Sequence, residues 1–381
     1  MTTSYRIHYP RGKALANFRE RPAASLLTVP GAALYGAVSG AVRRYRLSGR
    51  RRVEGPTIVS VGNIEVGGNG KTPFALRLIA DLRERGQRPV YVSRGFMSAA
   101  EKMSVVTVVW PSDRTPVAHM PVSVRFIRAD EPDLYYEVGD EGAMVAAASP
   151  STPLFFSSDR ERAMEVAHEV YRPTHIILDD AFQRWSAGRD VDIVLLDSEH
   201  PFGNGRLIPA GTLRERPAAL SRATFVGING VSESTDLPDY EKRVSEACER
   251  RVPVFGVSRT LAVINPSDGR GIESAGHAAA LSAIARPVSF EAALQRSGMT
   301  LAASFRFPDH HRYTARDLDY VARELSTVGV DSVVTTDKDW VKLRGAGVPF
   351  NVLVARLAMN VVGCDIGELT KKPQAMPAAR S

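Results

Sequence analysis

The 381-residue chain has little cysteine: Cys248 and Cys364 are the only two, and they lie far apart with no metal-ligand spacing. This scarcity argues against a disulfide framework and against a thiol mechanism, and it fits a reducing compartment. Internal repeats and low-complexity tracts are not apparent either. With 44% hydrophobic residues, the chain is expected to form ordinary packed cores, and its length suggests two domains.

The chain also lacks a hydrophobic run well suited to crossing a membrane. A stretch of 21 residues, 22–42, carries no charge, but prolines and glycines interrupt it and Ala, Ser and Thr dilute its hydrophobicity. A signal peptide is a poor match as well, because the preceding residues are mixed in charge and an arginine cluster follows.

Positive charge is abundant, with a net charge of +7 and a pI near 9.5, which indicates an anionic partner. Six arginines directly follow the charge-free stretch: Arg43, Arg44, Arg46, Arg50, Arg51 and Arg52. We therefore expect a cytoplasmic enzyme whose N-terminal helix, 32–47, lies in or near an anionic bilayer surface. A surface helix packed on its own domain is the alternative.

The segment 61–73, VGNIEVGGNGKTP, follows the apolar run 57–60 and precedes an amphipathic helical pattern over 74–85. A strand, a glycine loop and a helix start in this order direct backbone N–H groups at one point, beside a Lys and a Thr hydroxyl. A polyphosphate with Mg²⁺ fits such a loop. Glu65 replaces the first glycine of G-x-x-x-x-G-K-[ST], although Gly67, Gly68 and Gly70 keep the backbone free. A flexible turn that happens to end in Lys-Thr is the alternative.

The pattern over 57–229 alternates short apolar runs with helical periods, which predicts an α/β fold. Buried parallel strands are expected at 89–93, 174–178 and 191–196, and helices at 139–148 and from Asp159 to about 170. The segment 97–129 breaks this rhythm with β-rich runs at 104–110 and 122–127 and is expected to form a hairpin insert. A second α/β block begins near 252, with strands at 254–257 and 333–336 and helices at 289–296 and 314–326.

Carboxylates stand where a phosphate loop needs them. The apolar strand ending at Leu178 is followed by Asp179 and Asp180, and acids at the carboxyl end of a parallel strand can organise a metal. Adjacent carboxylates cost free energy unless a cation or donors compensate them. Asp140 and Glu141 follow Gly139 at a predicted helix start, where an Asp could accept a hydroxyl proton or could be an ordinary helix-start acid.

Two loops carry further polar groups. Asp309, His310 and His311 follow Phe307-Pro308 and could be metal ligands, a proton relay or plain loop polarity. Zinc is disfavoured because no Cys or further His lies at ligand spacing, so a relay or orienting role is preferred. The glycines and arginines of 201–217 suit phosphate contacts, and Glu215 is available to a metal.

Taken together and in order, these motifs resemble the tetraacyldisaccharide 4'-kinase family, the lipid A 4'-kinases of Gram-negative bacteria. The resemblance covers most of the chain. The carrying motifs are 61–63 with 67–73, Ser93-Arg94-Gly95-Phe96, Gly139-Asp140-Glu141, Asp179-Asp180-Ala181-Phe182-Gln183, 189–193, 202–205 with 209–215, Phe307-Pro308-Asp309-His310 and Thr336-Asp337-Lys338-Asp339.

The resemblance implies ATP- and Mg²⁺-dependent phosphorylation of the 4'-hydroxyl of tetraacyldisaccharide 1-phosphate at the cytoplasmic face of the inner membrane, by a peripheral or monotopic protein. It implies nucleotide contacts from Val66, Gly67, Gly68, Asn69, Gly70, Lys71 and Thr72, and a metal site drawn from Thr72, Asp179, Asp180 and Glu215. Within that site, Asp179 would support Lys71. Asp140 would be the base and His310 its partner, while Arg94 and Arg214 would bind substrate or nucleotide phosphates. Neither nucleic acid nor an obligate protein partner is implied.

The fold class implied is α/β and P-loop NTPase-like, with a mostly parallel sheet flanked by helices, a second smaller α/β domain and a membrane-associated N-terminal helix. We expect an apolar and basic segment at 1–52, a kinase domain at 53–230, a smaller domain at 231–370 and a flexible tail at 371–381. Three positions depart from the family pattern: the segment Phe96-Met97-Ser98, Gly142, and Arg184.

Two other classes of protein remain to be weighed. A P-loop GTPase or ATPase of the metal-insertion chaperone type would share the strand, the loop and the paired aspartates, and 336–339 superficially resembles a guanine-binding motif. Its order, with Asp337 before the Lys, suits the kinase family better. A non-catalytic membrane or nucleic-acid binding protein would use the arginines but would give no reason for Lys71, the paired aspartates and Glu215 together.

Overall fold

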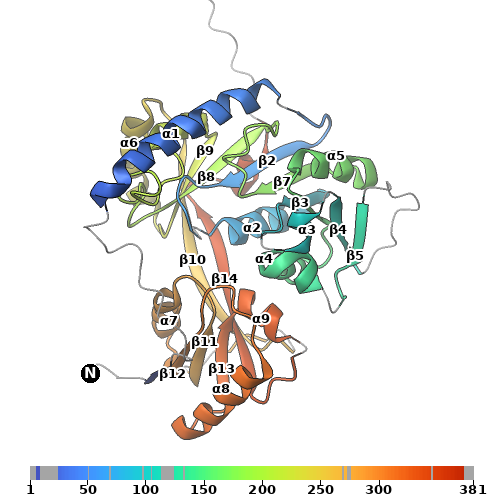
Figure 1. Cartoon of the computed structure of the whole chain (residues 1–381), viewed down its shortest axis with the longest axis vertical. Coiled ribbons are helices and arrows are strands. Elements are labelled where there is room, and N and C mark those ends of the chain that lie inside the picture. The colour runs from blue at the N-terminus through green and yellow to red at the C-terminus, as the bar shows by residue number, and fades with distance from the viewer. Residues whose placement is uncertain are drawn as a thin grey trace, which may run out of the picture. The chain divides into compact units, whose positions relative to one another are not determined.

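The computed structural model describes residues 6–8, 25–49, 51–67, 70–96, 98–103, 105–112, 124–131, 134–267, 270–272, 276–344 and 346–372. The chain forms two compact units. The larger consists of Arg19–Val138, Ala148–Arg259 and Met359–Ser381, and the smaller of Met1–Phe18, Gly139–Ala147 and Thr260–Ala358. We describe each unit by itself (Figure 1).

The larger unit is built on a mostly parallel sheet in the order β10-β9-β8-β2-β7-β3-β6-β4-β5. Among the described residues its strands pair in parallel, except that β4 and β6 are antiparallel. The strands are β2 (Thr57–Gly62), β3 (Pro89–Ser93), β4 (Val106–Trp110), β5 (Val124–Arg128), β6 (Leu154–Phe156), β7 (His175–Asp179), β8 (Val191–Asp197), β9 (Phe225–Asn229) and β10 (Val254–Ile264).

Helices cover this sheet, and side-chain alternation along the central strands decides which residues each helix meets. Ile58, Val90, Val92, Ile176 and Leu178 pack with α5 (Arg160–Tyr171) in one buried cluster. The intervening residues of these strands are therefore on the opposite side, and α2 (Lys71–Glu84) packs on β2, β3 and β7. The other helices of this unit are α1 (Ser25–Ser48), α3 (Ala99–Lys102), α6 (Leu237–Cys248), η3 (Pro217–Arg222), η4 (Ser234–Asp236) and η5 (Ile366–Thr370).

In the smaller unit, parallel strands follow one another in the order β1-β12-β11-β13-β14. Its strands are β1 (Arg6–His8), β11 (His277–Ser282), β12 (Thr300–Arg306), β13 (Ser332–Thr336) and β14 (Asn351–Val362), and its helices are α7 (Pro287–Arg296), α8 (Ala315–Val328) and α9 (Asp337–Leu343). Thr314 and Asp317 form a capping box at the start of α8, which fixes where the loop that contains His310 ends.

Helix α4 (Leu134–Ala148) is broken at Gly139, whose φ of 77° and ψ of 175° are not helical. The glycine tolerates this positive φ, which most residues avoid. The helix therefore restarts at Asp140, so the predicted helix over 139–148 is correct in its second part, and a further turn precedes it.

Most predicted strands and helices are present, and one prediction about the insert is wrong. The β-rich runs form β4 and β5, but these strands pair in parallel and are not a hairpin, because β6 takes the antiparallel position beside β4. The predicted N-terminal helix begins earlier than expected, at Ser25. In the described residues, no helix is long and apolar enough to span a membrane. Residues 373–381 of the predicted tail lie outside the described residues.

Candidate active site

The phosphate-loop lysine and threonine and the paired aspartates meet at one edge of the larger unit's sheet. β2 leads into the loop before α2, and its parallel neighbour β7 ends at Asp179. Because the carboxyl ends of parallel strands lie at the same edge, the start of α2 is brought to the end of β7. The Thr72 Oγ1 hydroxyl donates a hydrogen bond to Asp179 Oδ2 over 2.6 Å.

Asp179 is buried and hydrogen bonded on the side of the sheet that α2 covers. A second hydroxyl, that of Tyr91 on β3, donates to the same Oδ2 atom over 2.7 Å. Burial raises the pKa of Asp179, and the hydroxyls of Thr72 and Tyr91 oppose that shift. The two hydroxyls therefore fix the orientation of the carboxylate, and a cation beside it would stabilise its charged form.

Asp180 leaves the strand with a φ of 47°, an uncommon value for a residue other than glycine. Its carboxylate lies 3.5 Å from Lys71 Nζ and 2.9 Å from an Arg214 guanidinium nitrogen. Arg160, which is buried, donates to the backbone carbonyl of Asp180 over 3.2 Å. Although burial opposes ionisation, the charges of Lys71 and Arg214 lower the pKa of Asp180 to about 2.

These contacts add one detail to the expected site. The family resemblance implies that Asp179 supports Lys71, which stays a prediction, and the charge of Lys71 does favour ionisation of Asp179. The ion pair of Lys71 is with Asp180, and Asp179 accepts a hydrogen bond from Thr72. The reason is geometric. Asp179 is still in the strand and points toward α2, whereas the left-handed backbone at Asp180 turns its side chain toward the lysine.

The described part of the phosphate loop is held in place by its own side chains and by a second loop. Lys71 Nζ donates to the Gly67 carbonyl over 3.1 Å. The Val66 N–H donates to the Thr212 carbonyl over 2.8 Å, and the Thr212 hydroxyl donates to Glu65 Oε1 over 2.5 Å. Glu65, the departure from the usual glycine, therefore ties the two loops together. Gly68 and Asn69, both predicted nucleotide contacts, lie outside the described residues.

Gly70, which caps α2, has a φ of 75° and very little room around it. A Cβ atom at this position would lie 2.4 Å from Met359 Cε and 2.6 Å from Asn229 Nδ2. Both the backbone conformation and this close approach require glycine.

Glu215 is engaged by cationic and amide donors. Arg222 forms an ion pair with its carboxylate at 3.0 Å, and Gln183 Nε2 donates to Oε1 over 3.1 Å. Among the described residues, no three His, Cys, Asp or Glu side chains are grouped so as to hold a metal ion. The structure thus does not gather Asp179, Asp180 and Glu215 into one three-carboxylate site.

The two arginines expected to bind phosphates differ in their surroundings. Arg214 lies within the cluster, on Asp180. Arg94 forms an ion pair with Glu101 at 3.1 Å and stacks over the Phe96 ring, with 4.9 Å between guanidinium carbon and ring centre. Phe96 and Glu101 therefore hold the Arg94 guanidinium after the end of β3.

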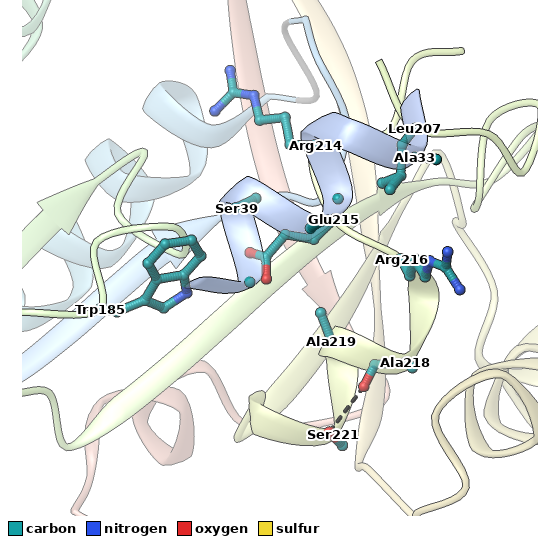
Figure 2. A pocket seen from close by; sticks show the side chains of 13 residues that line it. Ala33, Ser39, Trp185, Leu207, Arg214, Glu215, Arg216, Ala218, Ala219 and Ser221 are labelled. Atoms are coloured by element: carbon teal, nitrogen blue, oxygen red, sulfur yellow. Dashed lines mark hydrogen bonds between the residues drawn. The ribbon is translucent and has the colours of Figure 1, made fainter. Parts of the chain in front are cut away.

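A cavity of about 670 Å³ lies between α1 and the chain segment that carries Arg214 and Glu215 (Figure 2). The α1 side is lined by small residues, which let the segment approach closely. The lining residues are Ala33, Gly36, Ala37, Ser39, Gly40, Trp185, Leu207, Arg214, Glu215, Arg216, Ala218, Ala219 and Ser221. Figure 2 shows Glu215 and Trp185 beside the α1 helix.

The smaller unit holds a second cluster around Asp140, at the restart of α4. His310 Nδ1 lies 2.9 Å from Asp140 Oδ2. His310 also has a positive φ of 61°, so the loop holds it in a backbone conformation that is costly for residues other than glycine. The sequence analysis expected this pair, although 170 residues separate its members, and the prediction of their proximity is correct.

Two lysines of α9 complete this cluster. Lys338 Nζ lies 3.4 Å from Asp140 Oδ2, and Lys342 Nζ lies 3.8 Å from the same atom. Although burial opposes it, the His310 hydrogen bond and the lysine charges lower the pKa of Asp140 to about 2. The same hydrogen bond raises the pKa of His310. Asp140 is thus a firmly ionised carboxylate.

Four residues that contact the predicted site had no role assigned from the sequence: Tyr91, Arg160, Lys338 and Lys342. Tyr91 could have been found from strand alternation, because it lies on the opposite side of β3 from Val90 and Val92. The two lysines are four residues apart, which places them on one helix face, but α9 itself was not predicted. Nothing in the local sequence pointed Arg160 at a backbone carbonyl twenty residues away.

Comparison with known proteins agrees with this geometry. Residues 24–370 match the family described as tetraacyldisaccharide-1-P 4'-kinase. The chain belongs to this kinase family. A tetraacyldisaccharide 4'-kinase of Anaeromyxobacter dehalogenans (strain 2CP-C) is 35% identical over 303 residues, covering 77% of this chain and 74% of the relative. The enzyme of the same name from Syntrophus aciditrophicus (strain SB) is 33% identical, covering 75% of each chain.

A solved structure of the family shares the fold of this kinase. The crystal structure titled as the "apo" form of LpxK from Aquifex aeolicus in complex with ATP has a TM-score of 0.66 and 24% sequence identity, covering 89% of this chain and 96% of that one. The predicted family and kinase class are thereby confirmed. The chaperone-type GTPase or ATPase alternative has no support from these comparisons.

Proposed function

We propose that this kinase transfers the γ-phosphoryl group of ATP to the 4'-hydroxyl of tetraacyldisaccharide 1-phosphate, giving the 1,4'-bisphosphate precursor of lipid A. Membership of the family supports the reaction. The observation that carries the proposal is the meeting of Lys71 and Thr72 with Asp180 and Asp179, since a bare anion site would not need two carboxylates.

Lys71 and Arg214 are the cations at the proposed nucleotide phosphates. Both form ion pairs with the Asp180 carboxylate, which lets the two positive charges lie close together. Bound phosphate oxygens would interact with these two cations. The backbone N–H groups at the start of α2 would donate further hydrogen bonds to the phosphates. We assign the same role to the backbone of Val66, Gly67, Gly68, Asn69 and Gly70.

The residues present fit a magnesium ion at Thr72 and Asp179. A hydroxyl and a carboxylate oxygen lie 2.6 Å apart there, and Asp179 is a buried acid whose raised pKa a cation would reverse. Mg²⁺ commonly takes one or two carboxylates and completes its shell with water and phosphate oxygens, so two side chains suffice. When bound, the ion would neutralise charge on the phosphates. We place Asp180 next to this ion and Glu215 in a supporting position, because Arg222 and Gln183 already hold it.

Asp140 is the proposed acceptor of the sugar hydroxyl proton, with His310 as its partner. An ammonium group only donates hydrogen bonds, so the Lys338 contact at 3.4 Å makes His310 Nε2 an acceptor. The imidazole proton is then on Nδ1, which donates to Asp140. A carboxylate with a pKa of about 2 is a weak base, so positioning and charge neutralisation carry most of the rate enhancement.

We further propose that α1 attaches this kinase peripherally to an anionic membrane surface at the cytoplasmic face of the inner membrane. Four apolar or aromatic residues are exposed on one helical face: Leu34, Val38, Val42 and Tyr45. The cavity beneath α1 would then receive an apolar part of the lipid acceptor. Arg51 and Arg52 contribute less than their sequence position suggests, because they form ion pairs with Asp159 and Asp190.

The domain boundaries expected from the sequence, a kinase domain at 53–230 and a smaller domain at 231–370, stay a prediction. The absence of a nucleic-acid or obligate protein partner likewise stays a prediction.

The test is transfer of labelled γ-phosphate from ATP to tetraacyldisaccharide 1-phosphate in detergent micelles with Mg²⁺. We expect lipid labelling by the natural protein, labelling at least about 100-fold slower by Lys71→Ala, and a preference for ATP over GTP. Nucleotide hydrolysis without lipid labelling would show that the acceptor is wrong. Labelling by Lys71→Ala at the rate of the natural protein would contradict the phosphate-loop assignment.

A further inference from the structure

The segment 336–339, which superficially resembles a guanine-binding motif, forms the start of helix α9. Thr336 caps α9 by accepting a hydrogen bond from the Asp339 N–H over 3.1 Å. This cap sets the rotation of the short helix, and the four-residue spacing then places Lys338 and Lys342 on one face. Both ammonium groups lie within 4 Å of Asp140 Oδ2.

We propose that Lys338 and Lys342 are positioning residues that hold the Asp140 carboxylate ionised and fixed against His310. The inference rests on the proposed function, because Asp140 is the base of that reaction. It goes beyond that function because it gives a role to two residues of α9, a helix to which the proposed reaction assigns none.

Lys338 contacts both Asp140 and His310, and also Asp309. Its Nζ atom lies 3.4 Å from Asp140 Oδ2, 3.4 Å from His310 Nε2 and 3.3 Å from Asp309 Oδ1. By occupying Nε2 it selects the tautomer in which Nδ1–H points at Asp140. It also places a positive charge beside the imidazole, which opposes protonation of His310.

Lys342 is the buried anchor of the arrangement. Its side chain is 2% exposed, and Nζ lies 2.8 Å from Asp339 Oδ1. Asp339 is itself fully buried, and its other oxygen accepts from the Ala283 N–H and the Thr336 hydroxyl. Lys342 is thus paired with a carboxylate that two other groups of the fold hold in place. Its ammonium group therefore stays buried near Asp140.

The reason for two lysines follows from the burial of Asp140. Its side chain is 4% exposed, so its charge has lost most of its hydration. The Glu141 N–H donates to Oδ1 over 3.0 Å, which leaves Oδ2 to be compensated by His310 and the two lysines. A neutral histidine alone would supply one hydrogen bond and no charge.

The experiment compares Lys338→Met, Lys338→Arg and the control Arg344→Met in the full-length protein. Arg344 is an exposed cation at the end of the same helix. We expect Lys338→Met to lower kcat by up to about 100-fold, the loss expected when a reacting group is misplaced by 1 Å, with KM for ATP unchanged. Lys338→Arg should recover most of kcat, and Arg344→Met should match the natural protein.

A second readout does not depend on catalysis. The pKa of His310 is followed by NMR of histidine-labelled protein, and His310→Gln identifies its signal. We expect the pKa of His310 to rise in Lys338→Met, because a neighbouring positive charge has been removed. The acid limb of the kcat/KM profile should move to higher pH as Asp140 becomes easier to protonate.

An unchanged kcat together with an unchanged His310 pKa in Lys338→Met would overturn the proposal. If the natural protein transfers no phosphate but the His310 pKa still rises in Lys338→Met, the proposed reaction is wrong while the contact is real. For Lys342, the double variant Lys342→Met/Asp339→Asn removes both buried charges. A normal kcat in this variant, with an unaltered melting profile, would exclude Lys342.

Discussion

Replacing Asp140 by asparagine should change the stability of the smaller unit in a way that depends on pH. The natural carboxylate has a folded-state pKa of about 2 against an ordinary value of 3.8. One pKa unit corresponds to about 1.36 kcal/mol, so the shift is worth about 2.4 kcal/mol at neutral pH. Because the folded pKa is lowered, this stabilisation is full above pH 5 and falls as the pH drops through 3.8 toward 2.

The magnitude at each pH can be worked out from the same two values. At pH 3 about half of the stabilisation is left, roughly 1.3 kcal/mol, because the unfolded chain is then largely protonated at this position. The Asp140→Asn variant lacks the titration altogether. Its free energy of unfolding should therefore be lower by about 2 kcal/mol at pH 6, and the difference should shrink to about half as the pH approaches 3.

Urea unfolding followed by tryptophan fluorescence measures this difference. Trp340 lies in α9 of the smaller unit, so replacing Trp110 and Trp185 by phenylalanine leaves one probe beside the cluster. Asp319→Asn serves as a control, because Asp319 is exposed on α8 of the same unit. A difference between natural protein and Asp140→Asn that is constant from pH 3 to pH 7 would refute the reasoning, since it would show that no ionic stabilisation is involved.

Three further predictions address other parts of the chain. Lys71→Ala should lower kcat by about 10²–10³-fold or more, because it removes a donor to developing charge, while the melting temperature stays near the natural value. Arg184→Leu should cost about 3–5 kcal/mol of stability by leaving the buried Glu161 carboxylate unpaired, and adding Glu161→Gln should restore part of it; equal stability of single and double variants would contradict this. Leu34→Glu should weaken binding to anionic vesicles in a flotation assay, whereas Val288→Glu, at an exposed residue of the smaller unit, should not.

Much of the larger unit could be predicted from sequence, because its central strands are short apolar runs that end in polar loops. The phosphate loop, the paired aspartates and the capping Asp159 each carry a local signal with a direct physical meaning. The order of the strands was not predictable in this way. The parallel pairing of β4 with β5, beside the antiparallel pairing of β4 with β6, is set by tertiary structure, and no local pattern encodes it.

In the candidate site, too, the features with a local sequence signal could be predicted and those set by tertiary structure could not. The proximity of Asp140 and His310 was expected only from family resemblance, since 170 residues separate them. The ion pair of Lys71 with Asp180 could not be predicted, because the left-handed backbone at Asp180 cannot be recognised from two adjacent identical residues. The roles of Lys338 and Lys342 needed the register of a seven-residue helix that propensity alone did not reveal.

The position of the added phosphate tests the central claim most directly. The purified protein, ATP, Mg²⁺ and tetraacyldisaccharide 1-phosphate are incubated in micelles, and the product is analysed by ³¹P–¹H correlation NMR. The account predicts a second phosphomonoester coupled to the proton on carbon 4' of the distal sugar. A diphosphate at position 1, a phosphate on another hydroxyl, or inorganic phosphate alone would contradict it.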